Sequence, residues 1–109
     1  MEPLEAFGVV DVRVGRVVRA EPNDGARKPA IKLWIDFGPL GEKRSSAQLA
    51  ALSTPEELVG RLVVAAVHLG VRRVNGFASE VLVLGVPDDE GRVVLLAPDR
   101  DVPLGGRMF

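Results

Sequence analysis

Short stretches in which apolar and polar residues alternate, each ended by turn-forming residues, run through most of this sequence. Residues 31–37 show the pattern most clearly, because Ile31, Leu33, Ile35 and Phe37 alternate with Lys32, Trp34 and Asp36. Side chains on a β-strand point alternately to opposite faces, so we expect one face of this strand to be buried. Residues 9–20 begin with the same alternation, but its phase slips after Gly15, which predicts a bulged or sharply bent strand.

The remaining elements follow from the same pattern and from the turns between them. Residues 43–49 are expected to return as the partner of residues 31–37. Further strands are expected at residues 62–69, 71–74, 77–79, 81–86 and 92–97. Asn75-Gly76 predicts a tight hairpin turn. Thr54-Pro55-Glu56-Glu57 predicts one short helix with a capping box, which ends near Gly60.

The order of these elements is three strands, one short helix and then further strands. It predicts an all-β fold: a five-stranded Greek-key barrel of the OB-fold type, with one short helix between strands 3 and 4 and with N- and C-terminal extensions. The 109 residues are expected to form a single domain, residues 1–109. Such barrels commonly bind ligands on the face of strands 2 and 3 and in the adjoining loops.

The residue types that most often carry catalysis are scarce. The chain contains no cysteine, no tyrosine and a single histidine. His68 ends an apolar strand with no second histidine to assist it, so a packed or capped side chain is favoured over a general base. Residues 88–90 are acidic but lack the spacing of a calcium loop, so they predict a solvated hairpin tip. We therefore expect a binding protein with no catalytic residue, no metal site and no cofactor.

No segment predicts a membrane protein or a secreted one. The N-terminus is acidic and lacks the basic and apolar regions of a signal peptide. The longest apolar stretch, residues 62–71, has about half the length of a membrane span. A cytoplasmic protein without membrane insertion is therefore expected.

Two features favour binding. Trp34 is expected on the polar face of its strand beside Lys32, where it could stack on a nucleobase or lie in a subunit interface. The net charge is −1, from 14 Lys and Arg against 15 Asp and Glu, yet basic residues form local clusters. These are Arg27 and Lys28, Lys32, Lys43 and Arg44, and Arg72 and Arg73. A barrel could gather them on one side, or they could remain a scattered, solvated set.

Four segments resemble one family, the CsaA proteins: residues 26–38, Ser45-Ser46-Ala47-Gln48, residues 72–85 and residues 93–100. The resemblance covers essentially the whole chain. It implies the tRNA-binding OB domain that is also appended to methionyl-tRNA synthetases. It further implies a homodimer, an export-related chaperone that engages unfolded precursor polypeptides, and the absence of a catalytic cofactor.

The resemblance also suggests which residues contact RNA. They are the basic loop residues Arg27 and Lys28, then Lys32, Ser46, Gln48, Arg72, Arg73 and Ser79. Two departures from the family pattern affect this site. Residues 68–71 replace an asparagine followed by a proline-containing stretch, and Glu80 brings a negative charge close to the arginine pair.

Two functions are therefore expected as alternatives. The first is non-enzymatic tRNA binding combined with export-chaperone activity. The second is a purely polypeptide-binding secretion chaperone, with Trp34, Phe77 and His68 in the peptide groove or in a subunit interface. The apolar end of the chain, Arg107-Met108-Phe109, is expected to be buried against a partner subunit.

Overall fold

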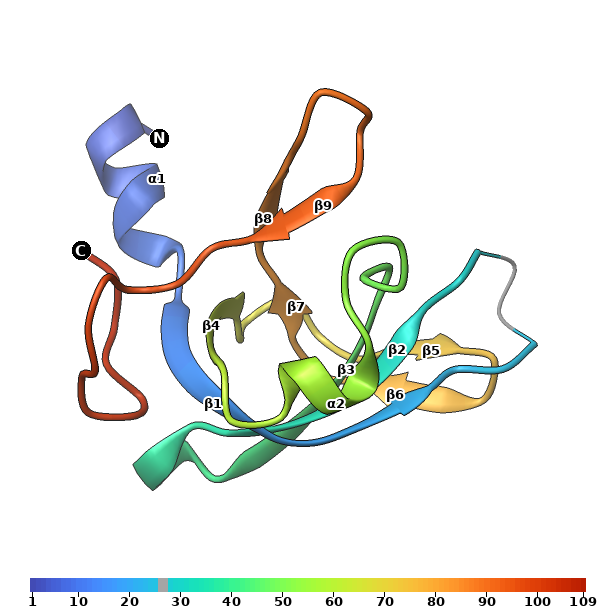
Figure 1. Ribbon diagram of the computed structural model, residues 1–109. Helices are drawn as coiled ribbons and strands as arrows, with labels where there is room; N and C mark the ends of the chain where they lie inside the picture. Colours follow the sequence, from blue (N-terminus) through green and yellow to red (C-terminus); the bar gives the residue numbers. More distant parts are fainter. Residues whose placement is uncertain (26–27) are drawn as a thin grey trace.

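Five antiparallel strands form one strongly coiled sheet in the order β3-β2-β1-β4-β7 (Figure 1). The computed structural model describes residues 1–25 and 28–109. The strands are β1 (Val12–Pro22), β2 (Ile31–Asp36), β3 (Glu42–Ala47), β4 (Leu62–Ala66) and β7 (Leu82–Val83). Backbone N–H groups of Glu80 and Val81 donate to the carbonyl of Arg44 in β3, at 2.7 and 3.3 Å, and bring the two ends of the sheet together. The predicted all-β barrel of the OB-fold type is confirmed.

The apolar face of β2 lies at the centre of the hydrophobic core, which other elements complete. Ile31, Leu33 and Ile35 are all buried, while their neighbours along the strand remain half-exposed. A fully buried aliphatic side chain of this size contributes about 1.5–3 kcal/mol relative to its exposed state. The alternation of residues 31–37 is therefore the main local signal for the position of the core.

Strand β1 is long because it pairs with β4 through its first half and with β2 through its second half. Gly15 lies against the core, and a Cβ at this position would overlap the side chain of Ile35 and lie 2.8 Å from the Phe37 ring. The register with β2 shifts between Val17 and Arg19. The predicted irregularity is therefore present, but the register shift comes after Val17, and Gly15 instead permits a close approach of two strands.

The short helix α2 (Pro55–Leu58) forms at its predicted place. The Thr54 side chain accepts a hydrogen bond from the backbone N–H of Glu57, and the Glu57 carboxylate accepts one from the backbone N–H of Thr54. These two bonds are the capping box that the sequence predicts. Leu58 is fully buried in the hydrophobic core, so the helix closes one side of the barrel interior.

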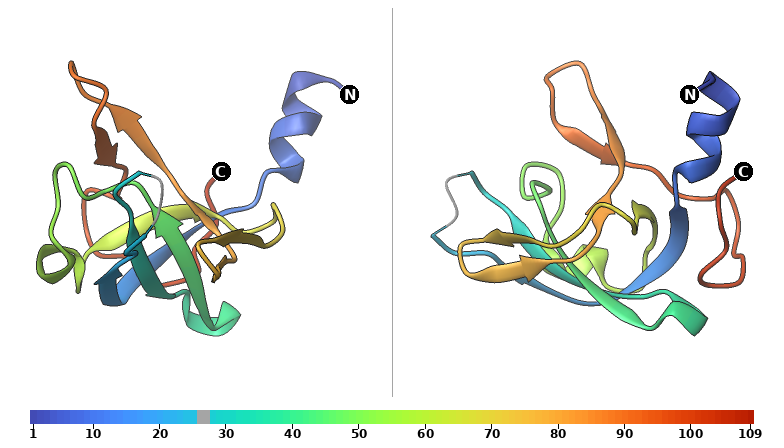
Figure 2. Two further views of the ribbon diagram at one scale, coloured as in Figure 1. Left: turned by 90° about the vertical axis from the view of Figure 1, so that its right-hand side faces the viewer. Right: turned by 180° about the vertical axis from the view of Figure 1, so that it is seen from behind.

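The loop between β4 and β7 carries a separate hairpin of β5 (Arg72–Val74) and β6 (Phe77–Ser79). Its turn residues Asn75 and Gly76 both have positive φ, 51° and 78°, as a tight two-residue hairpin turn requires. Figures 1 and 2 show this hairpin beside the loop that joins β1 to β2. The predicted turn is confirmed.

The prediction of a single strand at residues 81–86 is wrong, because these residues belong to two strands. The chain forms β7 and then turns away as β8 (Gly85–Pro87), which pairs with β9 (Val93–Leu95) in a second hairpin that projects from the barrel (Figure 1). A Cβ at Gly85 would lie 2.7 Å from the carbonyl oxygen of Val94. The glycine therefore lets the two strands of this hairpin approach closely at their base.

The two ends of the chain lie on the same side of the barrel (Figure 1). Helix α1 (Pro3–Val9) was not predicted from the sequence and has no buried residue. The C-terminal segment bonds to β1: the N–H of Val14 donates to Gly106, and the N–H of Met108 donates to Val12, at 3.0 and 2.8 Å. A single 3-10 turn, η1 (Gly38–Leu40), joins β2 to β3. Within the described residues, no helix is long and apolar enough to cross a membrane.

Candidate nucleic-acid interface

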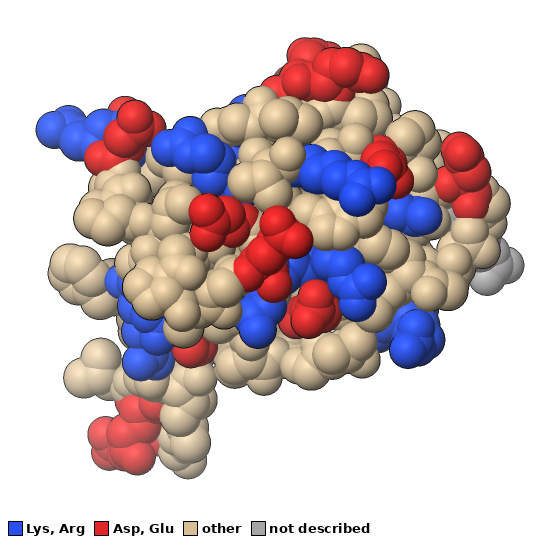
Figure 3. Space-filling view, turned by 90° about the horizontal axis from the view of Figure 1, so that it is seen from below, with Lys and Arg blue, Asp and Glu red and all other residues tan. Residues whose placement is uncertain are grey.

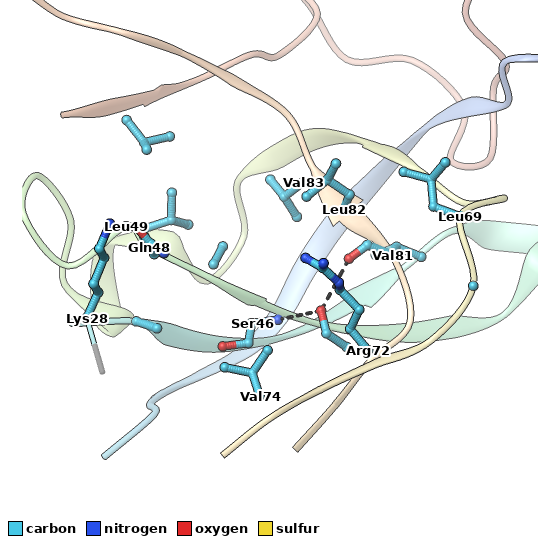
Figure 4. Close-up of a pocket in the computed structure, with 15 residues that line it drawn as sticks. Lys28, Ser46, Gln48, Leu49, Leu69, Arg72, Val74, Val81, Leu82 and Val83 are labelled. Carbon is cyan, nitrogen blue, oxygen red and sulfur yellow. Dashed lines mark hydrogen bonds between the residues drawn. The ribbon is translucent and has the colours of Figure 1, made fainter. Parts of the chain in front are cut away.

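A groove of about 790 Å³ lies between the end of β3, the β5–β6 hairpin and β7 (Figure 4). Five of the predicted RNA-contact residues line it: Lys28, Ser46, Gln48, Arg72 and Ser79. They come from the β1–β2 loop, β3 and the hairpin, which are far apart in the sequence. The barrel therefore brings most of the predicted set into one concave surface, which we call the groove.

The floor and walls of the groove are largely aliphatic. Its apolar lining includes Leu49, Val74, Val81, Val83 and Val93. No aspartate or glutamate is among the described residues that line it. The surface thus combines apolar contact area with two cations, Lys28 and Arg72, and a few hydrogen-bonding groups.

Ser79, at the end of β6, connects this strand to β3 through its side chain. Its Oγ accepts a hydrogen bond from the backbone N–H of Ser46 at 3.0 Å and donates to the carbonyl of Val81 at 3.4 Å. The next residue continues this arrangement, because the Glu80 carboxylate accepts from the backbone N–H and the Nε of Arg44, at 3.0 and 3.4 Å. Two backbone N–H groups of β3, those of Arg44 and Ser46, thus donate to side chains of residues 79–80 and not to backbone carbonyls. The Glu80 charge lies against Arg44 in this arrangement.

Asn23, which was not predicted as a site residue from the sequence, links three walls of the groove. Its side chain is buried, and Nδ2 donates to Ser46 Oγ at 2.9 Å and to the Val74 carbonyl at 3.3 Å. The neighbouring Asp24 carbonyl accepts a hydrogen bond from the Asn75 side chain. These bonds attach the β1–β2 loop to both β3 and the hairpin. In the sequence Asn23 belongs to a run of turn formers, and that signal indicates only a loop.

The cations differ in whether a carboxylate neutralises them. Seven arginines have an aspartate or glutamate oxygen within 4 Å: Arg13, Arg16, Arg19, Arg44, Arg92, Arg100 and Arg107. Figure 3 shows the resulting mixture of signs on the face that is lowest in Figure 1. Within the part of the chain that the structure describes, the cations without such a partner are Lys28, Lys32, Lys43, Arg61, Arg72 and Arg73.

Four of these unpaired cations belong to the predicted RNA-contact set. Lys28 and Arg72 line the groove, and Lys32 lies on the neighbouring strand β2. Arg73 is exposed and alternates with Arg72 and Val74 along β5, so it faces away from the groove. The predicted Arg72–Arg73 pair is thus divided between two faces of the hairpin. The predicted contact Arg27 lies outside the described residues.

Trp34 lies on the outer face of β2 in a cluster of aromatic and basic side chains. The Arg19 guanidinium lies 4.2 Å from the centre of the Trp34 ring, and Phe77 meets the same ring edge-on at 5.4 Å. Phe77 is itself buried, with Lys32 and Arg44 at 5.3 and 5.4 Å from its ring centre. Neither ring lines the groove, and Arg19 stacks on one face of the Trp34 ring.

His68 does not line the groove, although the next residue, Leu69, does, and the His68 ring lies beside the start of β1. Its Nδ1 is 3.3 Å from both the backbone nitrogen and the carbonyl oxygen of Asp11. A hydrogen bond from the Arg13 guanidinium, at 2.6 Å, lowers the pKa of the Asp11 carboxyl, with further help from Arg107 and His68 against the effect of burial. This cluster joins the start of β1 to the C-terminal segment, because Arg13 donates to the carbonyl of Gly105 at 3.0 Å and Arg107 Nε lies 3.7 Å from the Asp11 carboxylate.

The acidic residues 88–90 form a turn in which the Asp88 carboxylate accepts hydrogen bonds from its neighbours. Asp88 Oδ1 accepts from the backbone N–H groups of Glu90 and Arg92, both at 2.9 Å, and Oδ2 accepts from Arg92 Nε at 2.8 Å. The bond from the Arg92 backbone is the largest cause of a lowered pKa for Asp88. Across residues 1–25 and 28–109, no three His, Cys, Asp or Glu side chains gather as metal ligands would.

The comparisons with known proteins agree with this geometry. The profile of a family described as "Putative tRNA binding domain" matches residues 12–107, which contain the whole barrel and the groove. The chain belongs to the tRNA-binding domain family. Among its relatives is the methionine–tRNA ligase of Methanothrix thermoacetophila, 40% identical over 104 residues. The match covers 94% of this chain and 15% of the ligase, so the chain corresponds to a small part of that enzyme.

Solved structures of the same family match along the whole chain. The chaperone CsaA from Bacillus anthracis is 48% identical with a TM-score of 0.92, and the match covers 100% of this chain and 99% of that one. The CsaA chaperone protein from Picrophilus torridus is 37% identical with a TM-score of 0.90, and both chains are fully covered. The resemblance to CsaA proteins that the sequence indicated is confirmed.

Proposed function

We propose that this protein is a non-catalytic binding protein whose ligand is tRNA, held by the groove and the basic segments that flank it. The observation that carries this proposal is the distribution of ion pairs within a tRNA-binding domain. Within residues 1–25 and 28–109, most arginines elsewhere have a carboxylate beside them, whereas Lys28, Lys32, Arg72 and Arg73 do not. Cations without a partner are available to contact phosphate groups.

The roles of the remaining groups follow from their chemistry. Ser46 and Gln48 supply hydrogen-bonding groups suited to ribose or to base edges. The protein carries a net charge of −1, so long-range attraction of RNA is weak and binding depends on local contacts. Recognition of the shape and backbone of the RNA is favoured over recognition of a long sequence. A tRNA ligand supports a cytoplasmic location for the protein.

The test is a titration of bulk tRNA at two salt concentrations. If four cations replace counterions, the logarithm of the affinity falls with the logarithm of salt with a slope of about −3 to −4. Arg72→Ala should weaken binding and reduce the slope by about one. Arg61→Ala is the matched control, because Arg61 is exposed, has no carboxylate partner among the described residues and does not line the groove. Undetectable tRNA binding even at low salt would contradict the proposal.

The apolar lining of the groove favours a second candidate, binding of extended polypeptide by an export chaperone. Leu49, Val74 and Val83 could accept apolar side chains of an unfolded precursor. The similarity to CsaA chaperones supports this candidate. Peptide burial would depend little on salt and would show a negative change in heat capacity. An unfolded polypeptide titrated under the conditions of the tRNA experiment distinguishes the two functions.

We also propose that two copies associate through the side that carries both chain ends. Met1, Leu4 and Phe109 are strongly exposed there, and the C-terminal segment borders an apolar hollow of about 430 Å³. Exposed apolar surface of this kind marks an interaction site. Sedimentation should give twice the 11.7 kDa mass of one chain. Monomers at micromolar concentration would contradict this arrangement.

A further inference from the structure

The groove has a shape and lining that contact with an RNA duplex alone does not require. A duplex presents phosphates and riboses on a convex surface, and its base faces are covered by stacking. A protein that contacts only this surface needs exposed cations and hydrogen-bonding groups. The groove has both, and it also has an apolar floor of Leu49, Val74 and Val83.

The size and the lining of the groove suit one small ligand that has an apolar surface and negative charge beside it. Its volume of about 790 Å³ falls in the range of about 300–1,000 Å³ that small-molecule sites occupy. Figure 4 places Lys28 beside Gln48 and Leu49 at one side of the groove, and Arg72 toward the side of Leu69 and Val81. The two cations, Lys28 and Arg72, therefore lie on different sides of the apolar floor. An unpaired nucleotide within a chain matches this pattern, because its base has apolar faces and the phosphates on the two sides of its ribose carry the negative charge.

Two polar groups beside the floor remain able to bond to a ligand. Asn23 donates to Ser46 Oγ, and this bond leaves the hydroxyl hydrogen of Ser46 available as a donor. The Gln48 side chain is exposed and has no hydrogen-bond partner among the described residues. A hydroxyl and an amide together offer donors and an acceptor to the edge of a base.

We propose that the groove takes one unpaired nucleotide of an RNA chain. The base packs against the aliphatic side chains, and its flanking phosphates lie near Lys28 and Arg72. This inference rests on the proposed function, since it assigns a part of the RNA to the groove. The absence of carboxylates from the described lining favours RNA over polypeptide, because unpaired cations there match phosphate groups.

The test compares two probes with the same phosphates. One is a short, fluorescently labelled single-stranded RNA, and the other is an oligonucleotide of the same length with abasic sites in place of its bases. Anisotropy titrations at one salt concentration should show about tenfold tighter binding of the probe with bases. Unlabelled bulk tRNA should displace this probe.

A pair of leucine substitutions localises the effect. Leu82 lines the groove and Leu52 does not, and both side chains are exposed, so neither substitution is expected to prevent folding. Leu82→Ala should weaken binding of the RNA with bases about threefold to tenfold because it removes apolar contact area. It should leave binding of the abasic probe unchanged. Leu52→Ala should change neither affinity.

Three results would overturn the inference. Equal binding of the two probes, with tRNA still bound, would mean that only the backbone is recognised, and the proposed tRNA function would stand. Equal effects of Leu82→Ala and Leu52→Ala on the RNA with bases would place the base elsewhere. An unfolded polypeptide that binds with sensitivity to Leu82→Ala, while no RNA binds, would overturn both the inference and the proposed function.

Discussion

The side-chain amide of Asn23 donates a hydrogen bond of 2.9 Å to the Oγ of Ser46, across the gap between the β1–β2 loop and β3. The same Nδ2 donates to the carbonyl of Val74 in β5. One buried side chain therefore fixes the relative positions of three segments that border the groove. Because these segments carry Lys28, Gln48 and Arg72, the spacing of the binding groups depends on a residue that does not itself line the groove.

Asn23→Ala should lower both stability and tRNA affinity. Removing the amide leaves the Val74 carbonyl without this donor, and loss of a buried hydrogen bond of this kind costs about 1–3 kcal/mol. Urea unfolding measures the first effect, and tRNA titration of the folded variant measures the second. Combining Asn23→Ala with Arg72→Ala should give a smaller loss of affinity than the sum of the two single losses. Additive losses would mean that Asn23 does not position Arg72.

Ser79→Ala should affect stability much more than RNA binding. The hydroxyl already accepts from Ser46 and donates to Val81, so little of its bonding capacity remains for a ligand. The variant leaves a part-buried N–H group in β3 unsatisfied, at a cost of about 1–3 kcal/mol in unfolding free energy. The tRNA affinity of the folded variant should fall less than that of Ser46→Ala. The reverse order would assign Ser79 the direct RNA contact that the family resemblance implies.

Gly15→Ala should destabilise the barrel without changing its surface. The added Cβ would overlap Ile35 and lie 2.8 Å from the Phe37 ring, and overpacking a core commonly costs about 1–3 kcal/mol. Gly8→Ala is the matched control, because a Cβ there meets nothing within 4 Å and Gly8 lies in helix α1. Thermal unfolding should therefore show a lower midpoint for Gly15→Ala and an unchanged or slightly higher one for Gly8→Ala.

Features with a local cause could be predicted from the sequence. The alternation of residues 31–37 locates the core strand, because side chains on a strand point to opposite faces. Thr54 and Glu57 predict the capping box, and Asn75-Gly76 predicts the hairpin, because each signal acts within four residues. The same period of two also separates Arg72 from Arg73 on β5, although the two were predicted to form one basic cluster.

Features that depend on distant segments could not be predicted in this way. The strand expected at residues 81–86 divides at Leu84, whose N–H bonds to Val64 while its carbonyl accepts from Leu96. No local pattern contains those partners. The bonds of Asn23 and Ser79 likewise join residues 51 and 33 positions away along the chain. The general location of the candidate site could be predicted, but the division between groups that bind and groups that hold the walls could not.

Asp11 should make the attachment of the C-terminal segment sensitive to acid. The bond from Arg13 lowers the pKa of this carboxyl below its ordinary value of 3.8, and Arg107 and His68 act in the same direction. A carboxyl with a lowered folded-state pKa stabilises the fold fully above its unfolded-state value. That contribution is lost as the pH falls through the folded-state pKa. Stability should therefore decline below about pH 4.

Asp11→Asn should make the unfolding free energy depend less on pH in this range, as measured by urea unfolding between pH 2 and pH 6. The exposed Asp99, which pairs with Arg100 alone among the described residues, provides the control Asp99→Asn. An equal slope for wild type and Asp11→Asn would show that Asp11 contributes nothing to acid unfolding.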